Sequence, residues 1–391
     1  MVRDVDTAEE IAHESLVAAL EKWPESGVPE NPGAWLMATA KHRALDFVRR
    51  RKMLARKHDE LAHVTPDRYE SDAEEALDDA VGDDLLRLVF VACHPALTRE
   101  AQVALTLRLL GGLTTSEIAR AFLVPEPTIA QRIVRAKKSL TEKKVPFEVP
   151  SAAEIPARVA AVLEVLYLIF NEGYSATAGD DWMRPALCED ALRLGRILAE
   201  LVPAEPEVHG LVALMEIQAS RSRARVGASG DPILLLDQDR TRWDPIHIAR
   251  GIAALEKGDA LVRNGKSVGS YLVQARIAAC HARARTAADT DWPRIAALYA
   301  ALAAIAPGPI VELNRAVAVS MAFGPAAGLA IVDALRDDPA LADYHLFPSV
   351  RGDLLSKMGR HEEARSELER AAALTKNTRE RALLLDRARR S

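Results

Sequence analysis

Residues 124–140 read VPEPTIAQRIVRAKKSL, and they place two prolines directly ahead of regularly spaced apolar residues. Proline fits the first turn of a helix, where its missing N–H is not needed. From Thr128 onward the apolar residues recur at steps of three and four: Ile129, Ile133, Ala136 and Leu140. This spacing predicts a short helix with one buried stripe, and it leaves the basic side chains on the other face.

The residues before this helix predict a partner for it. Residues 114–124 read TTSEIARAFLV, which favours a short helix with Ile118, Ala119 and Phe122 inward and a turn at Leu123–Val124. Two short helices joined by a tight turn, the second with a basic face, form the helix-turn-helix arrangement. An ordinary αα-hairpin on the surface has the same periodicity, so this alternative stays open. The turn spacing and an earlier basic helix favour DNA binding.

The bulk composition indicates a mainly helical protein of two or more domains. The chain has 391 residues, of which 49% are hydrophobic and 27% charged, and runs of β-branched residues are scarce. No apolar run has the length of a membrane span, and the start MVRDVDTAEE lacks the apolar region of a signal peptide. The three cysteines are widely spaced, which predicts no disulfide framework and a reducing, cytoplasmic location.

Charge is distributed unevenly along the chain, although the net charge is only −5. Residues 41–57, KHRALDFVRRRKMLARK, carry eight basic residues against one acid, and residues 66–84, PDRYESDAEEALDDAVGDD, are strongly acidic. A second basic cluster follows over residues 132–144. This order predicts two cationic surfaces joined by an acidic connector.

Further helices are expected on either side of these segments. Residues 7–24, TAEEIAHESLVAALEKWP, open with a capping-box spacing and end at Pro24, with Ile11, Leu16, Ala19, Leu20 and Trp23 as apolar positions. A second helix is expected over residues 33–53 and another over 83–95. Thr98 is expected to cap a further helix, which Gly111–Gly112 stops.

From residue 159 onward the pattern indicates paired helices. The clearest pair, residues 344–375, reads YHLFPSVRGDLLSKMGRHEEARSELERAAALT and matches the tetratricopeptide (TPR) plan of two antiparallel helices around a small-residue turn. A looser copy spans residues 309–335, and the pairs before it look degenerate. The sequence therefore predicts a TPR-like α-solenoid, whose concave surface suits a protein partner and which has no catalytic apparatus of its own.

The two basic segments, with their order and separation, resemble bacterial RNA polymerase sigma factors of the extracytoplasmic-function (ECF) type over about residues 1–145. Residues 34–52, AWLMATAKHRALDFVRRRK, look like the sigma-2 helix that engages the minus-10 promoter element. Residues 113–140 look like the sigma-4 helix-turn-helix that reads the minus-35 element. The later chain, with YLIFNEGYSATAGDDWMRPALCEDALRLGRILAEL at residues 167–201, resembles the large TPR-like extension of one ECF group.

The resemblance implies an all-α chain with five consecutive parts. These are a sigma-2-like domain (1–62), an acidic linker (63–82), a sigma-4-like helix-turn-helix domain (83–145), a second linker (146–158) and the TPR-like extension (159–391). Sigma-2 domains of this type usually begin with a further helix, so we expect a helix to be missing ahead of residue 1. Leu123 and Pro127 stand where many sigma-4 turns carry glycine, which is expected to shift the recognition helix slightly.

The resemblance also implies core RNA polymerase, at its β′ clamp and β flap, and promoter DNA as partners. Docking on the clamp is expected from the first helix through Glu9, Glu10, His13 and Glu14, although a solvated charged face has the same pattern. Minus-10 contacts are expected from Lys41, Arg43, Phe47, Arg49, Arg50 and Arg51, the basic ones by neutralising phosphates. Minus-35 contacts are expected from Glu126, Thr128, Gln131, Arg132, Arg135 and Lys138, since glutamine suits adenine and arginine suits guanine. Thr128 is interpreted mainly as a helix cap.

No pattern of catalytic, cofactor-binding or metal-ligating residues is found. Cys93–His94 and Cys280–His281 are adjacent pairs without metal-ligand spacing, and neither a phosphate loop nor a nucleophile elbow is present. The most polar interruption of the helical region is FNEGYSATAGDDW, residues 170–182, with Asn171, Glu172, Asp180 and Asp181. It suits either a ligand or interdomain site or a loop packed on the sigma-like domains.

Taken with the resemblance, these observations predict a sigma factor that binds core polymerase and places two basic helices on a promoter. The resemblance further implies that the extension controls this activity in cis, whereas the periodicity alone indicates only a protein-binding surface. One alternative is a helix-turn-helix regulator that acts without polymerase and whose TPR domain senses a peptide or small ligand. Another is a TPR scaffold with vestigial DNA contacts. The basic segment at residues 41–57 separates the first two, because a conventional regulator does not need a second, promoter-melting helix.

Overall fold

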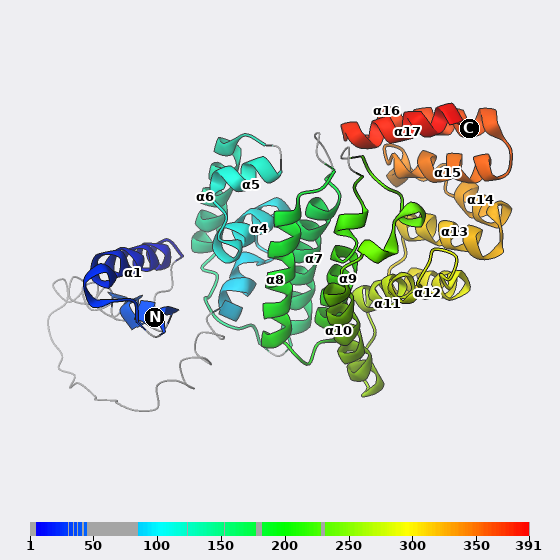
Figure 1. Cartoon of the computed structure of the whole chain (residues 1–391). Coiled ribbons are helices and arrows are strands. Elements are labelled where there is room, and N and C mark those ends of the chain that lie inside the picture. The colour runs from blue at the N-terminus through cyan, green and yellow to red at the C-terminus, as the bar shows by residue number, and fades with distance from the viewer. Residues whose placement is uncertain are drawn as a thin grey trace, which may run out of the picture. The chain divides into compact units, whose positions relative to one another are not determined.

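The computed structural model describes residues 5–29, 31–33, 35–36, 38–40, 43–44, 85–122, 124–151, 153–176, 182–227 and 231–390. In these ranges the regular elements are helices, and one isolated bridge joins Val226 to Pro232. The expected all-α fold is confirmed (Figure 1). The chain forms two compact units, Met1–Gly112 with Pro127–Arg158, and Leu113–Glu126 with Val159–Ser391.

Helix α1, Val5–Ser26, extends past the residue that was expected to end it. Pro24 lies inside the last turn, where its missing N–H costs a single hydrogen bond, and the chain turns instead at Gly27, whose φ is +80°. The buried side of α1 includes Ile11, Ser15, Ala18 and Ala19, whereas Leu16 and Leu20 are exposed. The described helical positions between residues 32 and 44 bring Trp35 edge-to-face onto Trp23, with the ring centroids 5.5 Å apart.

A helix at residues 85–92 ends at the turn that precedes α4, Arg99–Thr106. The buried Gln102 amide donates to the carbonyl oxygens of Cys93 and His94, at 3.1 and 2.9 Å, and so satisfies the carbonyls left free at that turn. Thr98 caps α4 as predicted, accepting from the N–H of Ala101. The π-helical turn η1, Leu107–Gly111, follows, and Gly112 ends it with a φ of +75°, as the glycine pair predicted.

The second unit is built from successive helices that pack on their neighbours in the chain. Proline stands at the first or second position of many of them. It disfavours the helical conformation in the residue before it, so it sets where each helix starts. The helices are α5 Thr115–Ala121, α7 Ile155–Tyr174, α8 Pro185–Leu201, α9 Pro206–Ala219, α10 Pro245–Arg263, α11 Ser270–Arg283, α12 Trp292–Ile305, α13 Pro309–Phe323, α14 Pro325–Ala334, α15 Leu346–Lys357, α16 His361–Leu374 and α17 Thr378–Arg390. Helix α9 packs against α8, α10 and α11 and is buried on nearly every side.

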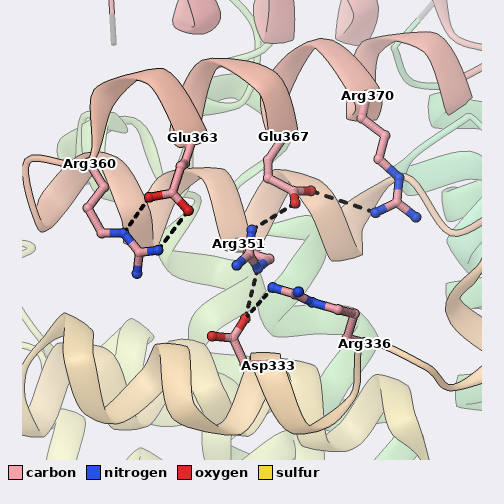
Figure 2. A network of polar contacts seen from close by, with 7 residues as sticks. All are labelled: Asp333, Arg336, Arg351, Arg360, Glu363, Glu367 and Arg370. Carbon is pink, nitrogen blue, oxygen red and sulfur yellow. Dashed lines mark hydrogen bonds and ion pairs between the residues drawn. The ribbon is translucent and has the colours of Figure 1, made fainter.

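The helix pair expected at residues 344–375 is confirmed as α15 and α16. Its turn is made by Gly359, whose φ of +73° favours glycine. Gly352 lets the two helices approach closely, because a Cβ there would lie 2.9 Å from Cγ of Leu368. Figure 2 shows the polar network of this region, in which Arg351 joins α15 to its neighbours through Asp333 and Glu367.

One interruption of the helical stack was not expected from the sequence. Between α9 and α10 the chain forms three short 3-10 turns, η2 Ser222–Ala224, η3 Leu235–Asp237 and η4 Arg240–Arg242. This stretch and the residue before it contain several arginines, namely Arg221, Arg223, Arg225, Arg240 and Arg242. The uniform helix pairs expected from residue 159 onward are therefore broken in the middle of the second unit.

Candidate nucleic-acid interface

Helix α5 begins with a reciprocal cap made by two of its first residues. The carboxylate of Glu117 accepts from the N–H of Thr114 at 2.8 Å, and the N–H of Glu117 donates to the Thr114 hydroxyl at 3.2 Å. Ile118 and Ala119 are buried, as the periodicity predicted, and Phe122 is half-buried. The N–H of Val124 donates to the carbonyl of Ala119 and closes the turn that leads to α6.

Helix α6, Glu126–Glu142, has the buried stripe that its spacing predicted. Its buried residues are Ile129, Ile133, Ala136 and Leu140. Most of the residues expected at the minus-35 element are exposed, namely Glu126, Thr128, Gln131, Arg135 and Lys138, and Arg132 is half-buried. The helix begins two residues before Thr128, so the interpretation of Thr128 as its cap is wrong.

Two basic residues near and just after the end of α6 have partners within the chain that the sequence did not predict. Lys143 belongs to the second basic cluster, and its ammonium group donates to the carbonyl of Ala96 at 2.9 Å, which ties the end of this segment to the turn before α4. Lys138 lies 3.7 Å from Glu142, one turn further along the exposed face. An exposed pair of this kind is weak, so Lys138 stays available to an incoming phosphate.

Val134 on the exposed face was missed by the sequence reasoning. It is 64% exposed and lies on the same side of α6 as Gln131 and Arg135. The sequence does contain a sign of its exposure, because Val134 directly follows the buried Ile133 and therefore falls outside the buried stripe of α6. An exposed valine beside arginine and glutamine suits contact with the methyl group of thymine in the major groove.

In the first unit the structure joins two residues for which different partners were expected. Arg43, expected at the minus-10 element, donates to the carboxylate of Glu14, expected at the polymerase, at 2.5 Å. Both side chains are exposed enough for a partner to compete with this pair. Glu10 and His13 are exposed on α1, while the side chain of Glu9 lies outside the described part. Outside it too are Lys41, Phe47, Arg49, Arg50 and Arg51.

The cysteines lack the surroundings of reactive or metal-binding thiols. All three are buried and unpaired. Burial raises the pKa of Cys93 to about 11 and that of Cys188 to about 12, so both thiols stay protonated at neutral pH. Within the described ranges no group of three or more His, Cys, Asp or Glu residues is arranged to hold a metal ion.

The polar segment at residues 170–182 contributes one internal pair. Glu172, which is buried at the end of α7, pairs with Arg184. Asp180 and Asp181, the other two acids of the segment, lie outside the described residues. Asn171 is half-buried and bonds to Tyr167, where its hydrogen bond acts against the rise in the Tyr167 pKa that burial causes.

Comparison with protein families places these elements in known regions. Residues 1–53 match sigma-70 region 2 and residues 87–140 match sigma-70 region 4. The chain belongs to the sigma-70 family. Region 2 contains α1, and region 4 contains α4, α5 and most of α6. Residues 158–259 match a family of unknown function, DUF6596, which covers α7 to α10.

The chain is also similar to an uncharacterized protein, R00370, of Rhizobium meliloti (strain 1021). The two are 44% identical over 384 residues, which cover 98% of this chain and 89% of that protein, so they belong to one family. No solved structure matches the chain. Regions 2 and 4 support a non-catalytic role in promoter recognition together with RNA polymerase. Over the described residues, no helix of this sigma-70 family member is long and apolar enough to cross a membrane.

Proposed function

We propose that this sigma-70 family protein directs transcription initiation as a factor of the ECF type. Its region 2 binds the β′ clamp and the minus-10 element, and its region 4 binds the β flap and the minus-35 element. The observation that carries the proposal is the occurrence of both regions in one chain, in this order. The limits proposed for its parts are 1–62, 83–145 and a TPR-like extension at 159–391, with linkers between them.

Reading of the minus-35 element is assigned to the exposed side of α6. Gln131 and Arg135 lie one turn apart there, so both reach the same stretch of major groove, glutamine toward adenine and arginine toward guanine. Val134 supplies the apolar contact between them, and Lys138 a phosphate contact. The buried stripe from Ile129 to Leu140 holds this side of α6 away from the core.

The extension is proposed to control the sigma regions in cis. Support comes from the division of the chain, since Leu113–Glu126, which includes α5, forms one compact unit with the extension. Asp190 on α8 is influenced by Glu117 on α5. Burial raises the pKa of Asp190 most, Arg193 lowers it, and the like charges of Glu189 and, to a smaller extent, Glu117 raise it.

The central test is run-off transcription from the DNA upstream of the gene, with purified core RNA polymerase and the full chain. We expect transcripts that require both proteins. Arg135→Ala should reduce them roughly 10- to 100-fold, since a good base contact contributes about 1–3 kcal/mol. Arg365→Ala is the matched control, because Arg365 is an exposed helical arginine that pairs with Glu369, one turn away on the same helix.

A different result would favour the polymerase-independent regulator. In that case no transcript depends on the added protein, while the full chain alone still shifts the duplex and Arg135→Ala weakens the shift. A chain that neither shifts the duplex nor supports transcription would leave only the scaffold with vestigial DNA contacts.

Control by the extension is tested without removing it, because α5 shares a unit with it and a cut would disturb both. Asp190→Arg turns a repulsion between Asp190 and Glu117 into an attraction. If the extension acts through α5, transcript levels change while the helical content stays the same. Unchanged transcript levels would argue against control through this charge interaction.

A further inference from the structure

A cluster in the second unit alternates arginine side chains with aromatic rings. The guanidinium carbon of Arg225 lies 3.5 Å from the ring centroid of Tyr174, and that of Arg221 lies 5.7 Å from the same ring. Arg221 and Arg240 lie 5.8 and 5.0 Å from the ring of Trp243. We call this cluster the arginine–aromatic ladder, and its members in spatial order are Trp182, Arg225, Tyr174, Arg221, Trp243 and Arg240.

Two guanidinium groups of the ladder have no acidic partner in the described part of the chain. Arg221 is only 9% exposed, yet neither it nor Arg225 forms an ion pair or a side-chain hydrogen bond with a described residue. Arg240 differs, because its terminal nitrogens donate to the carbonyls of His281 and Ala284 and to the hydroxyl of Thr290. Among the described residues, the ladder therefore holds two cations without an anion.

Contacts with the rings do not satisfy these groups fully. A ring face covers the flat side of a guanidinium, whereas the N–H donors point outward in its plane and need acceptors. The buried Nε atoms of Arg221 and Arg225 have no partner among the described residues, and the same holds for the Tyr174 hydroxyl. Two arginines from one turn and a tyrosine from the end of α7 thus each keep a buried polar atom without a partner among the described residues.

The surroundings of the ladder supply little negative charge. His281 is neutral near pH 7, because burial first and then Arg221 and Arg240 lower its pKa to about 4. Asp289 favours the charged form of Arg240, but its carboxylate accepts from the N–H and the hydroxyl of Thr286. Burial and the nearby Arg225 both act to lower the pKa of Arg221.

A hollow borders the ladder at Trp243. Its volume is about 590 Å³, and its lining includes Trp243 of the ladder together with Arg223, Val226 and Arg242. Sites for small molecules have volumes of this size. The one carboxylate in the lining, Asp244, already accepts from the N–H groups of Ile246 and His247.

We propose that the ladder binds the carboxylate or phosphate group of a small-molecule ligand, with Arg221 and Arg225 as the donors. Guanidinium groups hold both oxyanions through paired, charge-assisted hydrogen bonds. The rings of Tyr174 and Trp243 flank the site and suit a planar group on the same ligand. The ladder lies within the stretch that matches DUF6596, and the proposal concerns binding alone, so it stands apart from the proposed function.

The test is a titration of the full chain with sodium phosphate and, separately, with citrate, at an ionic strength held constant with sodium chloride. Tryptophan fluorescence reports binding, since Trp182 and Trp243 belong to the ladder. We expect saturable binding of at least one anion that Arg225→Met weakens at least tenfold. The two probes distinguish a phosphate-bearing ligand from a carboxylate. Arg225 is half-buried, so the shorter, apolar side chain is expected to be accommodated.

Two matched variants keep this result specific. Arg250→Met removes an exposed arginine of α10 that belongs neither to the ladder nor to the lining of the hollow, and Arg132→Gln removes a half-buried arginine from α6, which tests for phosphate binding at its basic face. Neither should change the ladder's affinity. If Arg225→Met does not fold, Arg225→Lys keeps the charge and loses the paired hydrogen bonds, and it should show the same loss. Wild-type binding no stronger than chloride binding, or binding unchanged by both Arg225 variants, would overturn the proposal.

Discussion

Two buried arginines in the second unit have nearly equal exposure and opposite surroundings. Arg351 is 6% exposed and donates to Asp333 and Glu367, each at 2.8 Å, from the neighbouring helices α14 and α16 (Figure 2). Arg221 is 9% exposed and meets aromatic rings, without a carboxylate from any described residue. The pKa of Arg351 is raised because its two acids outweigh burial, whereas burial lowers that of Arg221. Arg351 is neutralised by acids of the chain itself, whereas Arg221 has no such acid among the described residues and is proposed to bind an anion.

The largest expected effect is a loss of stability when Arg351 is replaced. Arg351→Met leaves Asp333 and Glu367 without their shared partner, and breaking a buried pair in this way costs about 3 kcal/mol of unfolding free energy. The measurement is urea unfolding followed by circular dichroism. Arg360→Met is the control, because Arg360 is exposed and pairs with Glu363 on the surface, so it should change stability by less than about 1 kcal/mol. Equal losses in the two variants would contradict the structural role of the network.

The second-largest expected effect is the pH dependence of stability that His281 causes at the edge of the ladder. His281 is buried, its ring meets Trp292 edge-to-face, and the charged groups facing it are Arg221 and Arg240. Its pKa is about 4 in the folded chain against 6.5 for an ordinary histidine, so the unfolded chain binds a proton first as the pH falls. The free energy of unfolding is therefore unaffected by protonation of His281 above pH 6.5, and it falls as the pH drops from 6.5 toward 4.

Between pH 7.5 and pH 5 the wild type should therefore lose about 2 kcal/mol more than His281→Gln. Urea midpoints at the two pH values give this difference. His361→Gln, at an exposed histidine, should behave as the wild type. The same pH dependence in wild type and His281→Gln would mean that His281 is not held neutral beside the arginines.

The sequence predicted features that depend on residues close together in the chain, and it did not predict those that depend on packing between distant residues. The stripe of α6, the Thr98 cap and the pair α15–α16 were predicted, because each rests on spacings within one or two turns of helix. The stop at Pro24 was wrong, since a proline in a last turn costs too little to end a helix. The ladder was not predicted. Its members come from residues 174–243 and meet only through packing. In the segment at 170–182 the candidate residues were Asn171 and three acids, not Tyr174 and Trp182.

A smaller effect is expected at the ladder itself when no anion is present. Arg221→Met loses its contacts with Tyr174 and Trp243, each about 0.5–1 kcal/mol, but it also removes the cost of burying an unpaired charge. The net change in unfolding free energy should stay within about 1 kcal/mol. Measured beside Arg351→Met under the same conditions, it gives the comparison directly. A loss as large as that of Arg351→Met would make the ladder a structural element.

The smallest effect is expected at the thiols, which report whether the ladder region opens locally. Cys188 is buried behind the ladder, with its Sγ 3.6 Å from the carbonyl of Phe170, whereas Cys280 borders a surface hollow of about 420 Å³. Labelling with a thiol reagent should therefore modify Cys280 first. Burial raises the pKa of Cys188 to about 12, so its labelling should wait for global unfolding and share the urea dependence of that step. Cys188 labelled as fast as Cys280 would mean that the segment around Tyr174 opens on its own. The unpaired arginines would then be reached by water in the native state, and burial alone would no longer argue for an anion.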